Sequence, residues 1–228
     1  MKVALFDFCE TLTNFQTAEY YVMFALKKTS RYRYYERALS INWLENLIKR
    51  NWKLRKKILL FFLCGVSKEE LVEIAKEYYN TYIKPNSFNC MRSLIFQYKR
   101  KGYQTYIISG GYSIYIDIYA KECGMDGVVA NDFKYKEKNG KYVFTGKLVN
   151  KDCMEEEKIN RIESLFQDMD IDDSIAFSDS YSDLPLLKWA DKGVVVSKYK
   201  RRKFAEKEGF DQIVISEIGN EKMELTEK

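Results

Sequence analysis

Polar residues able to do chemistry follow short apolar runs at three places in the sequence. Asp7, Ser109 and Asp179 each end such a run, and Asp183 comes four residues after Asp179. Short apolar runs bounded by polar turns are typical of buried parallel strands, and open α/β sheets bind ligands beyond the carboxyl ends of their strands. The three carboxylates would form a hard-oxygen site suited to Mg²⁺. Ser109 and the backbone N–H of Gly110, at the start of a helix, could hold phosphate oxygens.

The composition removes several kinds of catalysis. Histidine is absent from the 228 residues. This absence excludes Ser–His and Cys–His catalysis, zinc sites with histidine ligands and histidine general bases. Any catalytic group must therefore be a carboxylate, Lys, Ser, Thr, Tyr or Cys.

The predicted elements form an α/β fold with an inserted cap. Strands alternate with helices along most of the chain, which indicates a doubly wound parallel sheet. Apolar residues recur at helical spacing through 14–84, and this predicts a helical cap between two parts of the core, 1–13 and 85–228. Asn139-Gly140 between alternating segments predicts a hairpin within 133–149. The last predicted helix and strand, about 200–207 and 213–215, lie in the C-terminal region.

The six residues Asp7-Phe8-Cys9-Glu10-Thr11-Leu12 resemble the opening motif of the haloacid dehalogenase superfamily of phosphohydrolases, usually written D-x-D-x-T-[LIV]. Ser109, Lys158 and the Asp179/Asp183 pair resemble its later motifs, in the branch related to phosphoserine phosphatase. The resemblance covers about residues 2–197. It implies a Rossmann-like core whose helical cap covers the site and selects the substrate.

The resemblance also implies a role for each matching residue. Asp7 would be the nucleophile that forms an aspartyl-phosphate, and Thr11 would orient the loop. Lys158 would contact Asp7 and the phosphate, with Arg161 as the rival cation one helical turn on. The implied substrate-binding residues are Ser109, Gly110 and Thr11. The implied ligands of Mg²⁺ are Asp7, the backbone carbonyl of Cys9, Asp179 and Asp183.

Cys9 departs from the family pattern, which has a second Asp at this position. That Asp protonates the leaving group and later activates water, and a thiol is a weak substitute. Three interpretations follow. The enzyme is slow or restricted to substrates with good leaving groups, such as acyl phosphates, aryl phosphates or diphosphates; Glu10 or a cap residue supplies the acid; or the protein is a binding relic with little turnover.

The positive charge is concentrated in the cap. The net charge is +5, yet residues 27–60 carry eleven basic and two acidic residues, a net +9, which leaves −4 for the rest. Such a segment favours an anionic partner. Its cations and aromatics, such as Arg31–Tyr35, Trp43 and Trp52, could grip a nucleotide, a sugar phosphate or a membrane surface, or could form an ordinary solvated helix face with its aromatics in the cap core.

From these observations we expect a cytoplasmic, Mg²⁺-dependent phosphatase that acts on a small phosphorylated substrate. The five widely spaced cysteines predict free thiols, and the longest apolar run, seven residues, is too short to cross a membrane. One alternative is a phosphotransferase or weakly active regulatory relative. Another is a module that binds anionic lipid or, less favoured, nucleic acid through the basic cap. A dehalogenase is disfavoured because it needs no acidic metal pair.

Overall fold

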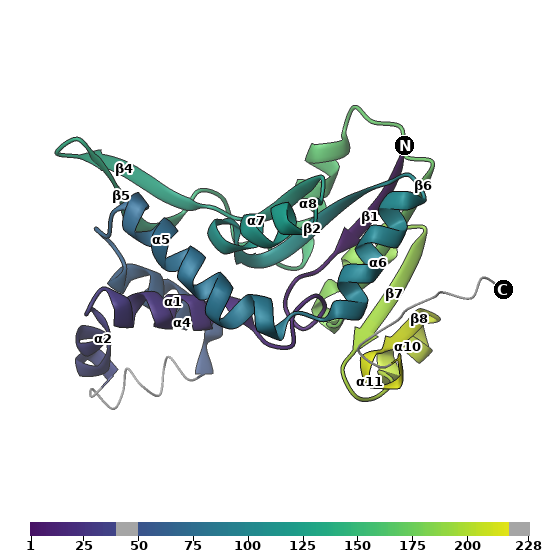
Figure 1. Cartoon of the computed structure of the whole chain (residues 1–228), viewed down its shortest axis with the longest axis horizontal. Helices are drawn as coiled ribbons and strands as arrows, with labels where there is room; N and C mark the ends of the chain where they lie inside the picture. The colour runs from purple at the N-terminus through teal and green to yellow at the C-terminus, as the bar shows by residue number, and fades with distance from the viewer. Residues whose placement is uncertain (40–49, 219–228) are drawn as a thin grey trace.

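A computed structural model describes residues 1–39 and 50–218, and its centre is a parallel sheet (Figure 1). The strand order is β3-β2-β1-β6-β7-β8, with β1 between the two halves. The α/β prediction is therefore confirmed. The strands are β1 (Lys2–Phe6), β2 (Tyr103–Tyr112), β3 (Gly127–Asn131), β6 (Asp173–Ser178), β7 (Lys192–Ser197) and β8 (Asp211–Val214).

Helices cover both faces of this sheet because its strands are apolar on both sides. Ala4 and Phe6 of β1 belong to the larger core cluster, which includes α6 and α7, whereas Val3 and Leu5 belong to a second cluster with α8 and α9. This alternation fixes which face of the sheet each side chain of β1 meets. The helices are α6 (Asn89–Arg100), α7 (Ser113–Glu122), α8 (Glu156–Phe166), α9 (Leu184–Trp189), α10 (Lys203–Glu208) and α11 (Ile215–Ile218), with a short 3₁₀ turn at Tyr181–Asp183.

A group of helices is inserted between β1 and β2, where the cap was predicted. Ser67 caps one of them, because its hydroxyl accepts a hydrogen bond from the Glu70 N–H at 3.2 Å. Part of the predicted cap, with Trp43, Leu44, Leu47 and Ile48, lies outside the described residues. The helices are α1 (Thr17–Lys28), α2 (Tyr32–Leu39), α4 (Trp52–Phe62) and α5 (Lys68–Tyr78), followed by a π-helical turn (Tyr79–Ile83) and a 3₁₀ turn (Lys84–Asn86).

The predicted hairpin forms, and it packs against these helices. Its strands are β4 (Phe133–Lys138) and β5 (Lys141–Leu148), joined by Asn139 and Gly140, both with positive φ. The Gly65 N–H donates to the Phe144 carbonyl at 2.7 Å, and the Phe144 N–H donates to the Val66 carbonyl at 2.8 Å. Figure 1 shows the hairpin extending from the core beside α5.

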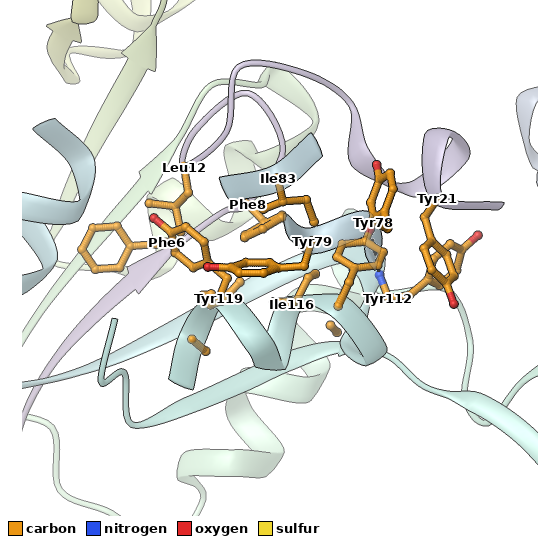
Figure 2. Packing of buried hydrophobic residues seen from close by; sticks show 14 of the residues in the cluster. Phe6, Phe8, Leu12, Tyr21, Tyr78, Tyr79, Ile83, Tyr112, Ile116 and Tyr119 are labelled. Atoms are coloured by element: carbon orange, nitrogen blue, oxygen red, sulfur yellow. Dashed lines mark hydrogen bonds between the residues drawn. The ribbon is translucent and has the colours of Figure 1, made fainter. Parts of the chain in front are cut away.

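Buried tyrosines join the inserted helices to the core (Figure 2). Tyr21 of α1 and Tyr78 of α5 have ring centroids 5.4 Å apart, and each lies within 5.5 Å of Tyr115 of α7. Their hydroxyls stay satisfied: Tyr21 donates to the Leu71 carbonyl at 3.1 Å and Tyr78 to the Thr17 carbonyl at 2.9 Å. These contacts hold α1 and α5 firmly over the carboxyl edge of the sheet.

Strand β2 is longer than the apolar run that predicted it. The expected strand spans 104–108, but β2 continues to Tyr112 and includes Ser109, Gly110 and Gly111. The pairing with β3 shifts between Ile108 and Tyr112, where Tyr112 meets Asn131. Small residues permit this irregularity, which places the Ser109–Gly111 backbone at the sheet edge.

Two further sequence predictions concern the chain as a whole. All five cysteines lie in the described part of the chain, and each is a free thiol, as predicted. None of the helices within 1–39 and 50–218 combines the length and the apolar character needed to cross a membrane.

Glu122 links three elements at the base of the insertion, and its loss should cost stability in a pH-dependent way. Its carboxylate accepts hydrogen bonds from Arg92 and Tyr79, both at 2.7 Å, and from Lys84 at 3.2 Å. The bonds from Arg92 and Tyr79 lower the pKa of Glu122 to about 2. Because the folded-state pKa is depressed, this stabilisation is present above the unfolded-state value and disappears as the pH falls towards 2.

Glu122→Gln should therefore lower the free energy of unfolding at pH 7 by about 1–2 kcal/mol, a figure kept small because the side chain is 31% exposed. Urea denaturation at pH 7 and at about pH 3 measures this effect. The difference from the wild type should shrink at the lower pH. Glu163→Gln, on the exposed face of α8, is the control. An equal loss at both pH values would contradict the ion-pair explanation.

Candidate active site

Three buried charged side chains are in contact at the carboxyl edge of the sheet: Asp7, Lys158 and Asp183. Asp7 directly follows β1, and its N–H donates to the Phe177 carbonyl of the neighbouring β6 at 2.8 Å. The Lys158 ammonium, from α8, donates to Asp7 Oδ1 and to Asp183 Oδ2, both at 2.7 Å. Asp7, Lys158 and Asp183 are only 6%, 2% and 3% exposed. A buried cation held between two carboxylates leaves one oxygen of Asp7, Oδ2, free of the lysine.

Asp179 completes the acidic side of the site. It follows β6, and the Thr11 hydroxyl lies 3.5 Å from both Asp179 Oδ1 and Asp7 Oδ2. Burial raises the pKa of Asp7 to about 6 against the opposing charge of Lys158. Burial, followed by repulsion from Asp7, raises the pKa of Asp179 to about 8. Burial opposes the charge on Lys158, but Asp7 and Asp183 outweigh it and raise the pKa of that ammonium. With all three ionised, the carboxylates would carry more negative charge than one lysine balances, and this repulsion adds to burial in raising the pKa of Asp179.

The donors around this surplus suit a hard divalent cation. Asp183 Oδ1 is buried and has no hydrogen-bond partner, although Oδ2 of the same carboxylate accepts from Ser178 and Lys158, each at 2.7 Å. Mg²⁺ is usually held by a few carboxylates and completed by water and phosphate oxygens. Among the described residues, no group of three or more Asp, Glu or Cys side chains is arranged to hold a metal ion by itself. The protein thus offers a partial oxygen site of the kind that Mg²⁺ uses.

Ser109 and Gly110 lie on β2, the strand that pairs with β1. Ser109 is buried, and its hydroxyl accepts from the Gly111 N–H at 3.0 Å. A Cβ on Gly110 would overlap Met154 Sδ, and one on Gly111 would lie 2.7 Å from the Tyr115 hydroxyl, so a larger residue at either position would displace its neighbours. Their small size lets the backbone approach a bound anion closely.

A polar network that sequence reasoning missed supports Gly110. The Gly110 carbonyl accepts from Asn131 Nδ2 at 2.8 Å and from Lys56 Nζ, on α4, at 3.1 Å. Asp152 accepts from both of these donors, at 2.7 Å and 2.6 Å. Asn131 is the last residue of β3, so its position after the Val128-Val129 run could have indicated a polar side chain at the edge of the sheet. The sequence carried no comparable signal for Lys56 or Asp152.

Of the two cations predicted near the phosphate site, Lys158 is the one beside Asp7. Arg161 Nη1 donates instead to the Ala130 carbonyl at 2.7 Å, and its Nε pairs with Glu157 at 3.3 Å. The three-residue spacing turns the guanidinium towards β3, away from the carboxylates.

A cavity of about 380 Å³ joins these groups. All the predicted site residues except Thr11 line this cavity, and the Thr11 hydroxyl lies 3.5 Å from Asp7 and Asp179. The lining site residues are Asp7, Cys9, Ser109, Gly110, Lys158, Asp179 and Asp183.

The sequence comparison decides the family. A family model described as haloacid dehalogenase-like hydrolase matches residues 4–188, a span that includes every predicted site residue. The chain belongs to the haloacid dehalogenase-like hydrolase family. The predicted membership, and with it the prediction of a hydrolytic enzyme, are confirmed. No curated protein sequence matches the chain.

Several solved structures share the fold of this haloacid dehalogenase-like chain over nearly its whole length. A protein of unknown function from Bordetella pertussis Tohama I is 21% identical with a TM-score of 0.76, covering 94% of this chain and 98% of its own. A substrate-bound phosphoserine phosphatase complex is 20% identical, with a TM-score of 0.63 and coverage of 95% and 96%. A phosphoserine phosphatase with a phospho-aspartyl intermediate analogue is 22% identical, with a TM-score of 0.60 and coverage of 94% and 93%.

Cys9, the departure from the motif of this hydrolase family, lies in the cavity wall but is tied to the cap. Its Sγ lies 3.1 Å from Thr17 Oγ1 and accepts from the Thr17 N–H, at the start of α1, at 3.4 Å. The Thr17 hydroxyl continues to the Tyr115 hydroxyl at 2.9 Å. Burial, with the charge of Asp7, raises the pKa of the Cys9 thiol to about 11. The thiol therefore keeps its proton at neutral pH.

Glu10 is not placed to replace the missing acid of the family motif. Its backbone has a φ of +57°, its side chain is exposed, and its carboxylate accepts from Gln16 Nε2 at 2.5 Å. Glu10 does not line the cavity. The interpretation in which Glu10 supplies the acid thus has no support in this geometry.

Proposed function

We propose that the protein is a Mg²⁺-dependent phosphatase that hydrolyses a small organic phosphate monoester through an aspartyl-phosphate on Asp7. The observation that carries this proposal is the position of Asp7: a buried carboxylate at the cavity wall, held through one oxygen by Lys158 at 2.7 Å. The other oxygen is left for attack. The similarity of fold to phosphoserine phosphatases, one of them with a phospho-aspartyl analogue, supports the same chemistry.

Each step of the proposed reaction can be assigned to residues of this chain. Asp7 Oδ2 attacks phosphorus, an Asp7–phosphorus bond forms, and the bond to the ester oxygen breaks. The departing ester oxygen takes a proton from solvent water. Water then attacks the aspartyl-phosphate, and inorganic phosphate leaves while Asp7 is regenerated. Lys158, Ser109 and the Gly110 N–H orient the phosphoryl oxygens and balance their charge.

Mg²⁺, when bound, would reduce the repulsion between Asp7 and the phosphate and stabilise the charge that develops in the transition state. Asp7, Asp179, Asp183 and the backbone carbonyl of Cys9 would hold it. Asp183 would contribute the oxygen that lacks a hydrogen-bond partner. Asp179 would be a further ligand, through the carboxylate whose pKa is raised by burial and by repulsion from Asp7.

Phosphate release is the test of this proposal. We expect hydrolysis of p-nitrophenyl phosphate with Mg²⁺, a loss of at least about 100-fold on addition of EDTA, and recovery when Mg²⁺ is restored. Asp183→Asn should show the same loss and respond less to added metal. Hydrolysis that continues unchanged in EDTA would argue against the metal, and the absence of hydrolysis with any ester would argue against the phosphatase.

The alternative functions involve the basic segment 27–60 or the fate of the aspartyl-phosphate. Several basic residues of segment 27–60 have internal partners: Lys28 pairs with Glu77, Arg31 donates to the Cys64 carbonyl, and Lys56 pairs with Asp152. Binding of nucleic acid or a membrane surface through this segment stays a prediction, to be checked as salt-sensitive binding to DNA or anionic vesicles. A phosphotransferase would use the same aspartyl-phosphate with an acceptor other than water.

A further inference from the structure

Most of the side chains that the inserted helices contribute to the cavity are apolar, and the polar ones among them are Gln16, Glu19 and Lys56. Ala18 and Val22 of α1 line it beside Trp52 and Leu59 of α4, and Tyr112 and Met154 close it from the core. The cavity volume of about 380 Å³ is near the lower end of the range for small-molecule sites. Such a chamber has room for a phosphoryl group and one small organic group.

The charged side chains of this chamber already have partners. Lys56 and Lys158 are the cations that line the cavity among the described residues. Lys56 is bound to Asp152 and the Gly110 carbonyl, and Lys158 is bound to Asp7 and Asp183. No lining cation within 1–39 and 50–218 is therefore free to meet a second anionic group on a substrate.

The acidic side chain that the inserted helices bring to the cavity also has a partner. Glu19 lines the cavity, and its carboxylate pairs with the Arg55 guanidinium. An ammonium group on a substrate would have to compete with Arg55 for this carboxylate. A zwitterionic organic group would thus enter an apolar chamber with neither of its charges matched, and unpaired charges are costly to bury.

We infer that the organic part of the substrate is uncharged and apolar, with the size of a single aromatic ring or a short branched alkyl chain. This inference rests on the proposed phosphatase function and gives its substrate class. The apolar side chains would exclude water from the organic group, while Trp52, half-exposed at the rim, would cover a planar ring. Phosphate esters of amino acids would be poor substrates, and so would bisphosphates.

A comparison of esters with similar leaving groups tests this inference. Benzyl phosphate, O-phosphoethanolamine and O-phosphoserine all release an alkyl alcohol, so they differ mainly in the charge and polarity of the organic group. We expect kcat/KM for benzyl phosphate to exceed that for O-phosphoserine by at least about 10-fold. Equal values, or a preference for O-phosphoserine, would overturn the inference while leaving the phosphatase in place.

Binding gives an answer that does not depend on turnover. Benzylphosphonate and 2-amino-3-phosphonopropanoate are not hydrolysed, and calorimetry with the wild-type protein and Mg²⁺ can compare them. We expect benzylphosphonate to bind about 10-fold more tightly or better. If no ester is hydrolysed but this preference is found, the proposed function fails and the apolar chamber stands. If the zwitterion binds as tightly, the inference fails.

A pair of variants at Ala18 separates charge from size. Ala18 is half-buried in the first turn of α1, a position where a longer side chain can extend into the chamber. Ala18→Lys should remove most of the benzyl preference and improve the relative kcat/KM for O-phosphoserine, whose carboxylate would find a partner. Ala18→Met, of similar length, should keep the preference. The same change in both variants would mean that charge does not set the selectivity.

Discussion

Replacing Asp7 with asparagine should reduce phosphate release by about 10⁴-fold or more, to the background of the assay. The amide oxygen of asparagine is a far weaker nucleophile than the carboxylate that attacks phosphorus. The change is nearly isosteric, and Lys158 keeps its 2.7 Å bond to Asp183, so we expect the fold to survive. Initial rates on p-nitrophenyl phosphate with Mg²⁺, together with a thermal melt, measure both expectations.

Two observations would separate this role from a general loss of charge. Asp168→Asn, at an exposed position after α8, should leave the rate within about twofold of the wild type. Mass spectrometry of the wild type quenched during turnover should find one phosphoryl group on the peptide that contains Asp7, and none in Asp7→Asn. If Asp7→Asn kept a tenth of the wild-type activity, another group would have to attack phosphorus.

Local patterns predicted the elements and the wall of the cavity because parallel strands bring their carboxyl ends to one edge. Asp7 follows β1, Ser109 lies in β2 and Asp179 follows β6, and these three strands are neighbours in the sheet. Asn139-Gly140 fixed the hairpin turn by its own backbone preference. In each case the information lies in a few consecutive residues.

Contacts between distant segments were beyond the reach of such patterns. Lys56 reaches Asp152 across 96 positions, and nothing near either residue distinguishes it from the other surface charges of its segment. The packing of the hairpin on α4 and α5 was likewise unpredicted, because the residues of β5 do not indicate which helices will cover them. Lys158, in contrast, was favoured over Arg161 by its place in the family motif, and it is Lys158 that lies beside Asp7.

The second large effect is expected when Cys9 is replaced by the aspartate that the family motif has at this position. Cys9→Asp should raise kcat/KM for an alkyl phosphate such as benzyl phosphate by about 10²-fold or more, because a positioned carboxylic acid contributes about 10²–10⁴-fold in proton transfer. The site can accept the change: the introduced carboxylate could take the hydrogen bonds that the thiol now makes with the Thr17 N–H and hydroxyl. Cys9→Asn, with the same shape but no acid, should give no gain.

The dependence on the leaving group distinguishes the interpretations of Cys9. If the thiol gives little acid help, the wild type should favour p-nitrophenyl phosphate strongly over benzyl phosphate, since a nitrophenolate departs without a proton. Cys9→Asp should then narrow this ratio by accelerating the alkyl ester alone. A uniform gain on both esters would point to a repaired geometry or metal site. No gain on either would mean that position 9 does not limit the reaction, and the thiol would then be compatible with full phosphatase turnover.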